Sequence, residues 1–478
     1  MEAYRECSTS TLESFINNLI PILTYIVAYK ILKILLFRFI PEKFKHFITF
    51  SLGLALLKFH YKEDLDLLVP FILLLINFKT VMPVGTLTAS GIVISAIVGG
   101  EIYFPSRNWS RVRGSILILA MKTVTAGSDH EIDLFGALGY LLHPATLLFG
   151  PWHSFKTYQS SLSHSFKPCV KSLLVTIVTL FLSVFCLSIS TCVAPYLVAD
   201  AYPDYDDDPD TIRSITGVKL HSFKIMSPII TTLLQGTESA YQFRFSWYYV
   251  GFLSTALASF SNLIEFESVK EGIFSVVNPI AVELPTCLSS VTSAWNKPIG
   301  NWIKLSIFYP LLEAGKEKFG HISASSCFGL DPRLSYRFII LMLTYILSSL
   351  LHGLDIRIFN ILFLLGFYTY VQYSIRSRLA LIFDKSGVAP QNSKYRQTLS
   401  KSVGFVQNFL TTVFQVGFFI INWLHLQYLG CIMMDDHGED WEPSNEGYRD
   451  LIYALWKGMD FFSLKISLGM FLTYLFIR

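Results

Sequence analysis

Charged residues are scarce in this chain. Only 15% of its 478 residues are Asp, Glu, Lys or Arg, whereas an average soluble domain carries about a quarter. Hydrophobic residues make up 52% of the chain and aromatic residues 15%, including 40 Phe. A soluble fold would need an unusually large core to bury this much apolar surface, so the composition argues against a soluble protein and predicts an integral membrane protein. The net charge of +3 is small and spread out, and it gives no indication of nucleic-acid binding.

Several chemical patterns are also missing. The seven cysteines are scattered without a CxxC pair, which excludes a disulfide framework and a cysteine zinc site. No two histidines share ligand spacing with a carboxylate, and neither a Gly-rich phosphate loop nor a serine elbow occurs. We therefore predict no metal site and no permanently bound cofactor. The polar segment 1–14 lacks the basic start and short apolar core of a cleaved signal peptide, so insertion is expected to rely on the first span.

What the chain has instead is a succession of apolar runs that are long enough to span or enter a bilayer. Some contain Gly and Pro, and such pieces are tolerated at membrane depth only where protein or a cavity surrounds them. We predict an all-α polytopic membrane protein, with one multi-pass domain over 15–478 and about ten to twelve transmembrane helices plus re-entrant segments. No internal repeat is visible, which argues against a typical secondary transporter. The runs are 15–37, 46–61, 66–82, 84–100, 114–122 with 132–150, 170–198, 226–236 with 240–263, 336–354, 356–375, 403–430 and 457–477.

Two late loops have opposite charge. Residues 376–401 hold six Lys or Arg and one acid, and residues 433–450 hold seven acids and one base. Because cytosolic loops carry an excess of Lys and Arg, the first loop is expected in the cytosol and the second in the lumen. One more span then places the C-terminus in the cytosol.

A single imidazole lies near the end of the apolar run 336–354. On a helix, Tyr345, Ser348, Ser349 and His352 share one face, and this polar strip should face protein or a wet cavity. Gly353 permits a helix end or a close approach of another segment. Two interpretations of His352 fit: an interfacial histidine bonded to a carbonyl, or a neutral imidazole that acts as a general base.

A second polar cluster covers residues 293–302. Trp295 and Asn296 precede Lys297-Pro298, which predicts a turn followed by a new helix that carries Trp302. Taken alone, this pattern is typical of an aromatic loop at the membrane interface.

WNKPIGNW (295–302) and, downstream, TYILSSLLHG (344–353) resemble the paired Asn and His motifs of the membrane-bound O-acyltransferases. The resemblance covers most of 140–478, whereas residues 1–120 match only in hydrophobicity. It implies a helical bundle of the type found in that family. The other matching segments are 148–155, 193–197, 249–254, 278–294, 369–380 and 424–430.

More narrowly, these segments are similar to the family member that attaches palmitoleate to a serine of Wnt proteins in the endoplasmic reticulum membrane. The resemblance implies palmitoleoyl-CoA as the donor, entering from the cytosol, and a Wnt serine arriving from the lumen. It implies that His352 is the general base, with Ser348 and Tyr345 available to fix its tautomer, and that Asn296 either donates its amide to the oxyanion or holds the thioester in line. The substrate-binding residues it suggests are Trp295, Tyr345, Ser348, Trp302, Gly150, Trp152, Arg376 and Arg378.

Alternatives stay open at this point. Arg376 and Arg378 are either contacts for coenzyme A or anchors that only set orientation. An enzyme of the same family that acylates a sterol, a glycerolipid or another protein would carry the same His and Asn. A channel or transporter with His352 along its path, or an inactive binder of lipidated protein, is a further alternative. A polar insert at 312–331 is a departure from the family pattern.

Overall fold

The computed structural model describes residues 2–80, 85–128, 132–163, 170–196, 228–263, 272–319, 332–383, 388, 405–433 and 445–477. Every regular element in these residues is a helix, which confirms the predicted all-α fold. The acidic tract at 200–210 lies outside them, as do residues 320–331 of the insert and large parts of both charged loops.

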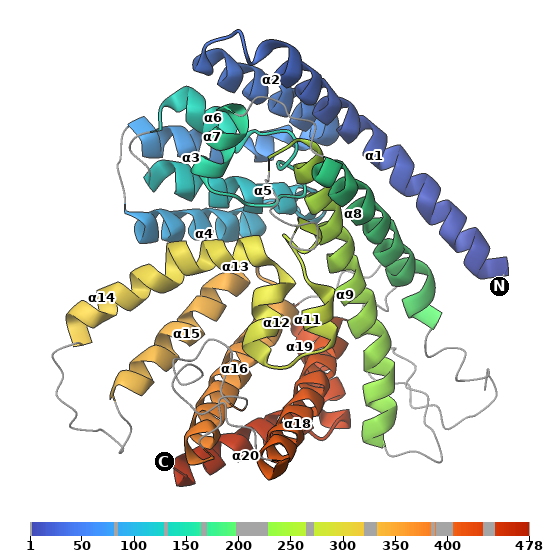
Figure 1. Cartoon of the computed structure of the whole chain (residues 1–478), viewed down its shortest axis with the longest axis vertical. Coiled ribbons are helices and arrows are strands. Elements are labelled where there is room, and N and C mark those ends of the chain that lie inside the picture. Colours follow the sequence, from blue (N-terminus) through green and yellow to red (C-terminus); the bar gives the residue numbers. More distant parts are fainter. Residues whose placement is uncertain are drawn as a thin grey trace. The chain divides into compact units, whose positions relative to one another are not determined.

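The chain folds into two compact units, and each unit draws on three stretches of sequence. The first comprises Met1–Ser188, Trp247–Val277 and Asn296–Leu354, and the second Ile189–Ser246, Asn278–Trp295 and Asp355–Arg478. Helix α9 (Pro228–Phe260) contributes to both (Figure 1). The first unit also contains α1 (Glu2–Leu36), α2 (Glu42–Tyr61), η1 (Lys62–Leu67), α3 (Val69–Thr80), α4 (Thr86–Tyr103), α5 (Ser106–Ser128), α6 (Leu134–Leu141), α7 (Phe155–Ser163), α8 (Val170–Ser188), α13 (Lys297–Ile303), η5 (Lys304–Phe308), α14 (Tyr309–Phe319) and α15 (Pro332–Leu351). The second also contains η2 (Ile189–Val193), η3 (Ala194–Tyr196), α11 (Pro279–Glu283), α12 (Leu288–Trp295), α16 (Ile356–Ile382), α18 (Phe405–Gly430), η7 (Cys431–Met433), α19 (Asn445–Gly458) and α20 (Phe462–Phe476).

Five helices in the described residues are long and apolar enough to cross a membrane, or six if the bent pair of α19 and α20 counts as one span. The chain is therefore a multi-pass membrane protein. The expected number of ten to twelve is not tested by this count, because it covers only the described residues and only long apolar helices; the apolar part of α15, for example, is the shorter helix Tyr336–Leu351. The five are Tyr4–Leu36, Thr86–Tyr103, Val170–Val193, Ile356–Ile382 and Thr411–Met433.

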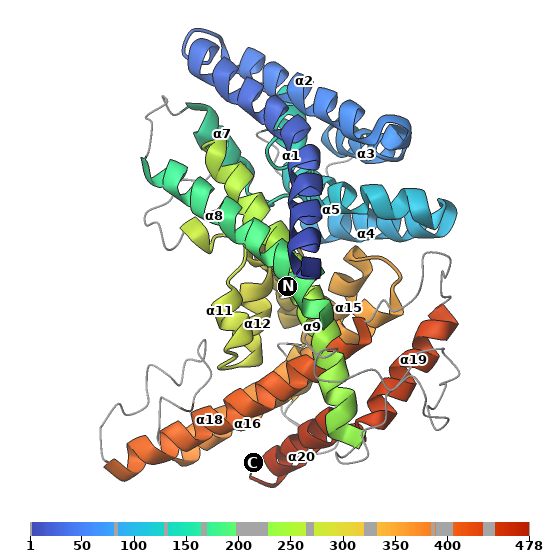
Figure 2. The same ribbon diagram turned by 90° about the vertical axis from the view of Figure 1, so that its right-hand side faces the viewer.

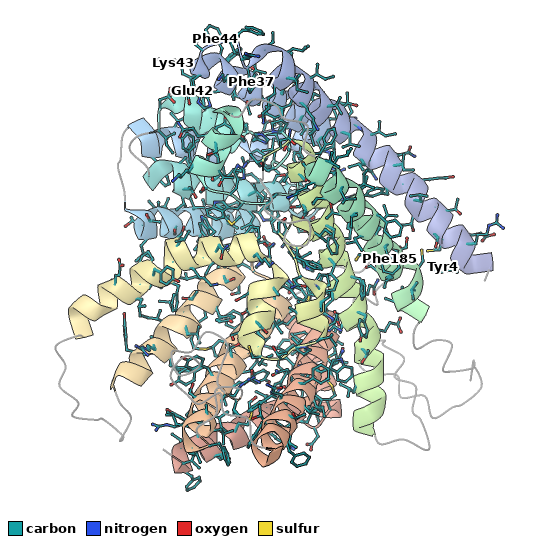
Figure 3. All side chains as sticks on the ribbon, in the orientation of Figure 1. Tyr4, Phe37, Glu42, Lys43, Phe44 and Phe185 are labelled. Carbon is teal, nitrogen blue, oxygen red and sulfur yellow. The ribbon has the colours of Figure 1, made fainter. Side chains whose placement is uncertain are left out.

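Helix α8 shows how the surface suits a lipid environment. Its large apolar side chains point outward: Val170 is 79% exposed and Phe181 is 69% exposed. Phe185, labelled in Figure 3, continues the same row one turn further and stacks on Phe181. A row of bare phenylalanine and valine side chains is expected to face hydrocarbon rather than water.

Helix α5 is the core of the first unit. It lies beside α4 in both views (Figures 1 and 2), and its residues from Ser115 to Val124 are all buried. A helix that is buried on every side is surrounded by protein, so it can contact several other segments at once. Near its start, the largely exposed side chain of Arg111 pairs with Asp64 of η1 at 3.3 Å.

A buried polar network organises the second unit. Gln372 of α16 accepts a hydrogen bond from the Leu288 backbone N–H and donates to the Asn422 side chain of α18. Asn422 in turn donates to the Pro285 carbonyl at 3.0 Å. These bonds fix the start of α12 on two long helices, since buried amides are stable only when their polar atoms are paired.

Candidate active site

His352 lies in the turn that ends α15. Its backbone N–H donates to the Ser349 carbonyl at 2.9 Å, and that of Gly353 donates to Leu350 at 3.1 Å. Gly353 has φ +95°, a conformation that side chains rarely allow, which confirms the predicted helix end at this glycine. The imidazole is partly exposed and packs edge-on against Trp247 of α9, with ring centroids 6.1 Å apart.

The imidazole nitrogens make no hydrogen bond to other residues that the structure describes. Ser349 donates to the Ile346 carbonyl at 2.7 Å, which is a bond within its own helix. Ser348 is buried on the same helix but forms no bond to the ring among the described residues, so the expected link from Ser348 to His352 is not made. Among the described residues, neither ring nitrogen therefore has a partner that would compete with a substrate.

Asn296 caps α13, whose first residue is Lys297. Its Oδ1 accepts a hydrogen bond from the Ile299 backbone N–H at 3.1 Å, and Pro298 occupies the first turn. This confirms the predicted turn and helix start. Within the described ranges Nδ2 has no acceptor, so the cap uses the oxygen and leaves the amide N–H groups free to donate.

Helix α5 supports both segments. The indole N–H of Trp302, fully buried on α13, donates to the Met121 carbonyl at 3.1 Å. Arg113 lies beside Gly353, the residue that follows His352 in the sequence. Arg113 and Met121 are eight residues apart on one helix, a rise of about 12 Å. One buried helix thus carries the contacts of the His352 turn and of the Asn296 helix.

The segment 148–155 is held by the same helix. Trp152 donates from Nε1 to Thr125 Oγ1 at 3.1 Å, and the neighbouring Gly150 has φ +77°. Lys122 is fully buried and donates to the Thr146 hydroxyl at 2.8 Å and to the Tyr140 carbonyl at 3.1 Å. A buried ammonium is stable only with such partners, so Lys122 fixes the loop that leads to Gly150.

The predicted site residues divide between the two units. Those of the first unit are His352, Asn296, Tyr345, Ser348, Trp302, Gly150 and Trp152, and those of the second unit are Trp295, Arg376 and Arg378. Trp295 stacks on Phe243, with centroids 5.9 Å apart. No three His, Cys, Asp or Glu side chains gather as metal ligands in the part of the chain that the structure describes.

Arg376 is buried in the second unit. Its Nη1 donates to the Thr286 carbonyl at 2.7 Å, its Nε donates to Val388 at 3.1 Å, and the guanidinium lies over the Phe418 ring. These contacts tie α16 to two loops. Arg378, two residues on, is partly exposed.

Replacing Arg376 with lysine should lower stability and leave donor binding unchanged. Lysine cannot make the two directed bonds, so we expect a loss of about 1–3 kcal/mol in unfolding free energy and, for the acyl-CoA donor that the resemblance implies, a KM within about twofold of wild type. Thermal unfolding and initial rates measure the two effects, and Arg378→Lys is the control. A raised KM with unchanged unfolding would instead identify Arg376 as a coenzyme A contact.

Three residues beside the His352 turn carry no signal in the sequence. Trp247 meets the imidazole from α9, and Glu101 and Arg113 meet Gly353 from α4 and α5. Only the position of Trp247, just before the matched segment 249–254, could have drawn attention to it. Glu101 and Arg113 lie within residues 1–120, where no matching motif was found in the sequence.

Comparison with known proteins adds a second line of evidence. The chain is 28% identical over 403 residues to the protein-serine O-palmitoleoyltransferase porcupine of Mus musculus, covering 82% of this chain and 78% of that protein. The chain is a relative of the porcupine proteins. The porcupine of Homo sapiens is 28% identical over 82% of this chain and 78% of its own length. The porcupine of Anopheles gambiae is 27% identical over 80% of this chain and 73% of its own length.

The similarity to porcupine proteins confirms the resemblance predicted from the sequence. It extends over about four fifths of the chain, so it includes more than the His and Asn motifs. No family model matches the chain.

Proposed function

We propose that the chain is a protein-serine O-palmitoleoyltransferase that moves a monounsaturated acyl group from acyl-CoA to a serine of a Wnt protein. The observation that carries this proposal is the similarity to porcupine proteins over 82% of the chain. The availability of both nitrogens of His352 and of the amide group of Asn296 supports it.

The proposed reaction begins when His352 takes the proton of the serine hydroxyl. The serine oxygen attacks the thioester carbonyl, and the developing oxyanion accepts a hydrogen bond from Asn296 Nδ2. The carbon–sulfur bond then breaks, and the imidazolium returns its proton to the coenzyme A thiolate. The products are an O-acyl serine and free coenzyme A, so atoms and charges balance.

The packing around His352 suits this role. Trp247 covers one side of the imidazole, which limits the orientations that the ring can take. A base held in one orientation next to its substrate lowers the entropic part of the barrier. We further propose the endoplasmic reticulum membrane as the location, with palmitoleoyl-CoA entering from the cytosol and the C-terminus on that side.

Expression with a Wnt protein and an alkyne-tagged palmitoleate analogue tests the proposal. We expect label on one serine of the Wnt protein, with the label absent from a Wnt variant in which that serine is alanine. Mass spectrometry of the labelled protein and of the lipid extract distinguishes the outcomes. Label in a sterol or glycerolipid, with none on the Wnt protein, would contradict the proposed substrate.

A further inference from the structure

The backbone after His352 is packed against an ion pair from the first third of the chain. A Cβ atom added to Gly353 would lie 2.7 Å from Glu101 Oε2 and 3.1 Å from Arg113 Nη1. The first distance is shorter than real Cβ contacts and the second is tighter than most of them, so a side chain at position 353 would have to displace the end of the Glu101 side chain. The His352 turn and the ion pair are therefore built around each other.

The ion pair joins α4 to α5, and the indole of Trp109 also contacts its acidic member. Glu101 of α4 lies 3.7 Å from Arg113 of α5, and its Oε2 accepts a hydrogen bond from the indole of Trp109. Trp109 is buried, and Gly100 lies against its ring, which leaves this indole little freedom. The Glu101 side chain is 23% exposed and that of Arg113 is 34% exposed, so both are partly shielded from solvent. Solvent therefore screens this pair less than it would a fully exposed one.

We propose that Glu101 and Arg113 are positioning residues that hold the His352 turn in its reactive geometry. The inference rests on the proposed function, in which His352 is the base. Neither side chain needs to touch substrate for this role. A displacement of about 1 Å at a reacting group can cost 10²-fold in rate, so a fixed contact one residue from the imidazole has a large effect.

The location of the pair explains why this contact is effective. Gly353 has no side chain to pack, and its backbone is in a conformation that glycine alone adopts freely. The turn therefore depends on its neighbours for rigidity. The cation also lies next to the C-terminal end of α15, where positive charge is favourable.

Three substitutions and one matched control test the inference. Glu101→Gln keeps an acceptor for the Trp109 indole and removes the charge. Arg113→Met keeps the aliphatic stem and removes the guanidinium, and Arg113→Lys keeps the charge. Arg111→Met is the control, because Arg111 is on the same helix with a side chain that is 68% exposed, and its partner Asp64 also accepts a hydrogen bond from Asn108.

The first readout is the release of free coenzyme A by the full-length protein in lipid nanodiscs with a Wnt substrate. We expect Glu101→Gln and Arg113→Met to lower kcat roughly 10- to 100-fold, with KM for acyl-CoA within about twofold. Arg113→Lys should restore much of the rate, and Arg111→Met should match wild type. A variant that combines Glu101→Gln with Arg113→Met should be no slower than the slower of the two single variants, because each substitution removes the same ion pair. Equal kcat values for the pair variants and the Arg111→Met control would overturn the inference.

The second readout does not depend on activity. Diethyl pyrocarbonate modifies exposed imidazoles, and mass spectrometry gives the rate at His352. We expect this rate to change severalfold in Glu101→Gln and Arg113→Met and to stay constant in Arg111→Met. A constant rate in every variant would contradict the inference whatever the chain's activity, whereas absence of any acyl transfer by the wild-type protein would contradict the proposed function alone.

Discussion

Replacing His352 with alanine is expected to abolish acyl transfer. The substitution removes the proposed general base, a group that typically contributes 10²- to 10⁴-fold in rate. Because the imidazole forms no hydrogen bond to the described residues and is partly exposed, the fold should lose little with it. Serine labelling of a co-expressed Wnt protein measures the activity, and thermal unfolding measures the stability.

His425 provides a matched control of the opposite kind. It is fully buried on α18, stacks on Tyr368 with centroids 4.5 Å apart, and bonds to the Ser463 hydroxyl at 2.6 Å. His425→Ala should therefore reduce stability while the folded fraction keeps its activity. If His352→Ala retains more than a few per cent of wild-type transfer, the imidazole is not the base.

Asn296 is expected to show that one side chain has two separable roles. In Asn296→Asp the carboxylate still accepts from the Ile299 N–H, so α13 keeps its cap, but the amide donor is lost. Removal of one oxyanion donor typically costs about 10²- to 10³-fold in kcat. We therefore expect a rate loss of that size in Asn296→Asp without a loss of stability.

Asn296→Ala separates the two effects when it is measured beside the aspartate variant. Alanine removes both the cap and the donor, so its rate loss should be similar, and its unfolding free energy should also fall by about 1 kcal/mol. Near-wild-type kcat in Asn296→Asp would mean that the amide group does not stabilise the oxyanion. In that case Asn296 would be a helix cap only.

The local structure of the two candidate segments could be predicted because their signals are local. Pro298 after Asn296 indicates a helix start, and Gly353 after His352 indicates a helix end, and both features are present. Such signals depend on backbone conformations that a few neighbouring residues determine. The all-α fold was predictable for a similar reason, since apolar runs of this length fold as helices in a bilayer.

The supports of the site could not be predicted, because they depend on contacts between distant parts of the chain. Trp302 and Met121 are 181 residues apart, and the acceptor is a backbone carbonyl, which no pattern of side chains encodes. Glu101 and Arg113 are ordinary charged residues at the level of sequence. Their importance follows only from the packing of α4 and α5 against the His352 turn.

The burial of α5 has a consequence for genetics. Since this helix contacts the His352 turn, Trp302 of α13 and the Trp152 loop together, one altered residue in it can disturb all three. Loss-of-function alleles should therefore be frequent between Arg113 and Thr125, although none of the proposed catalytic residues lies in this range. Most of the outward-facing residues of α8, by contrast, should tolerate replacement by other apolar residues.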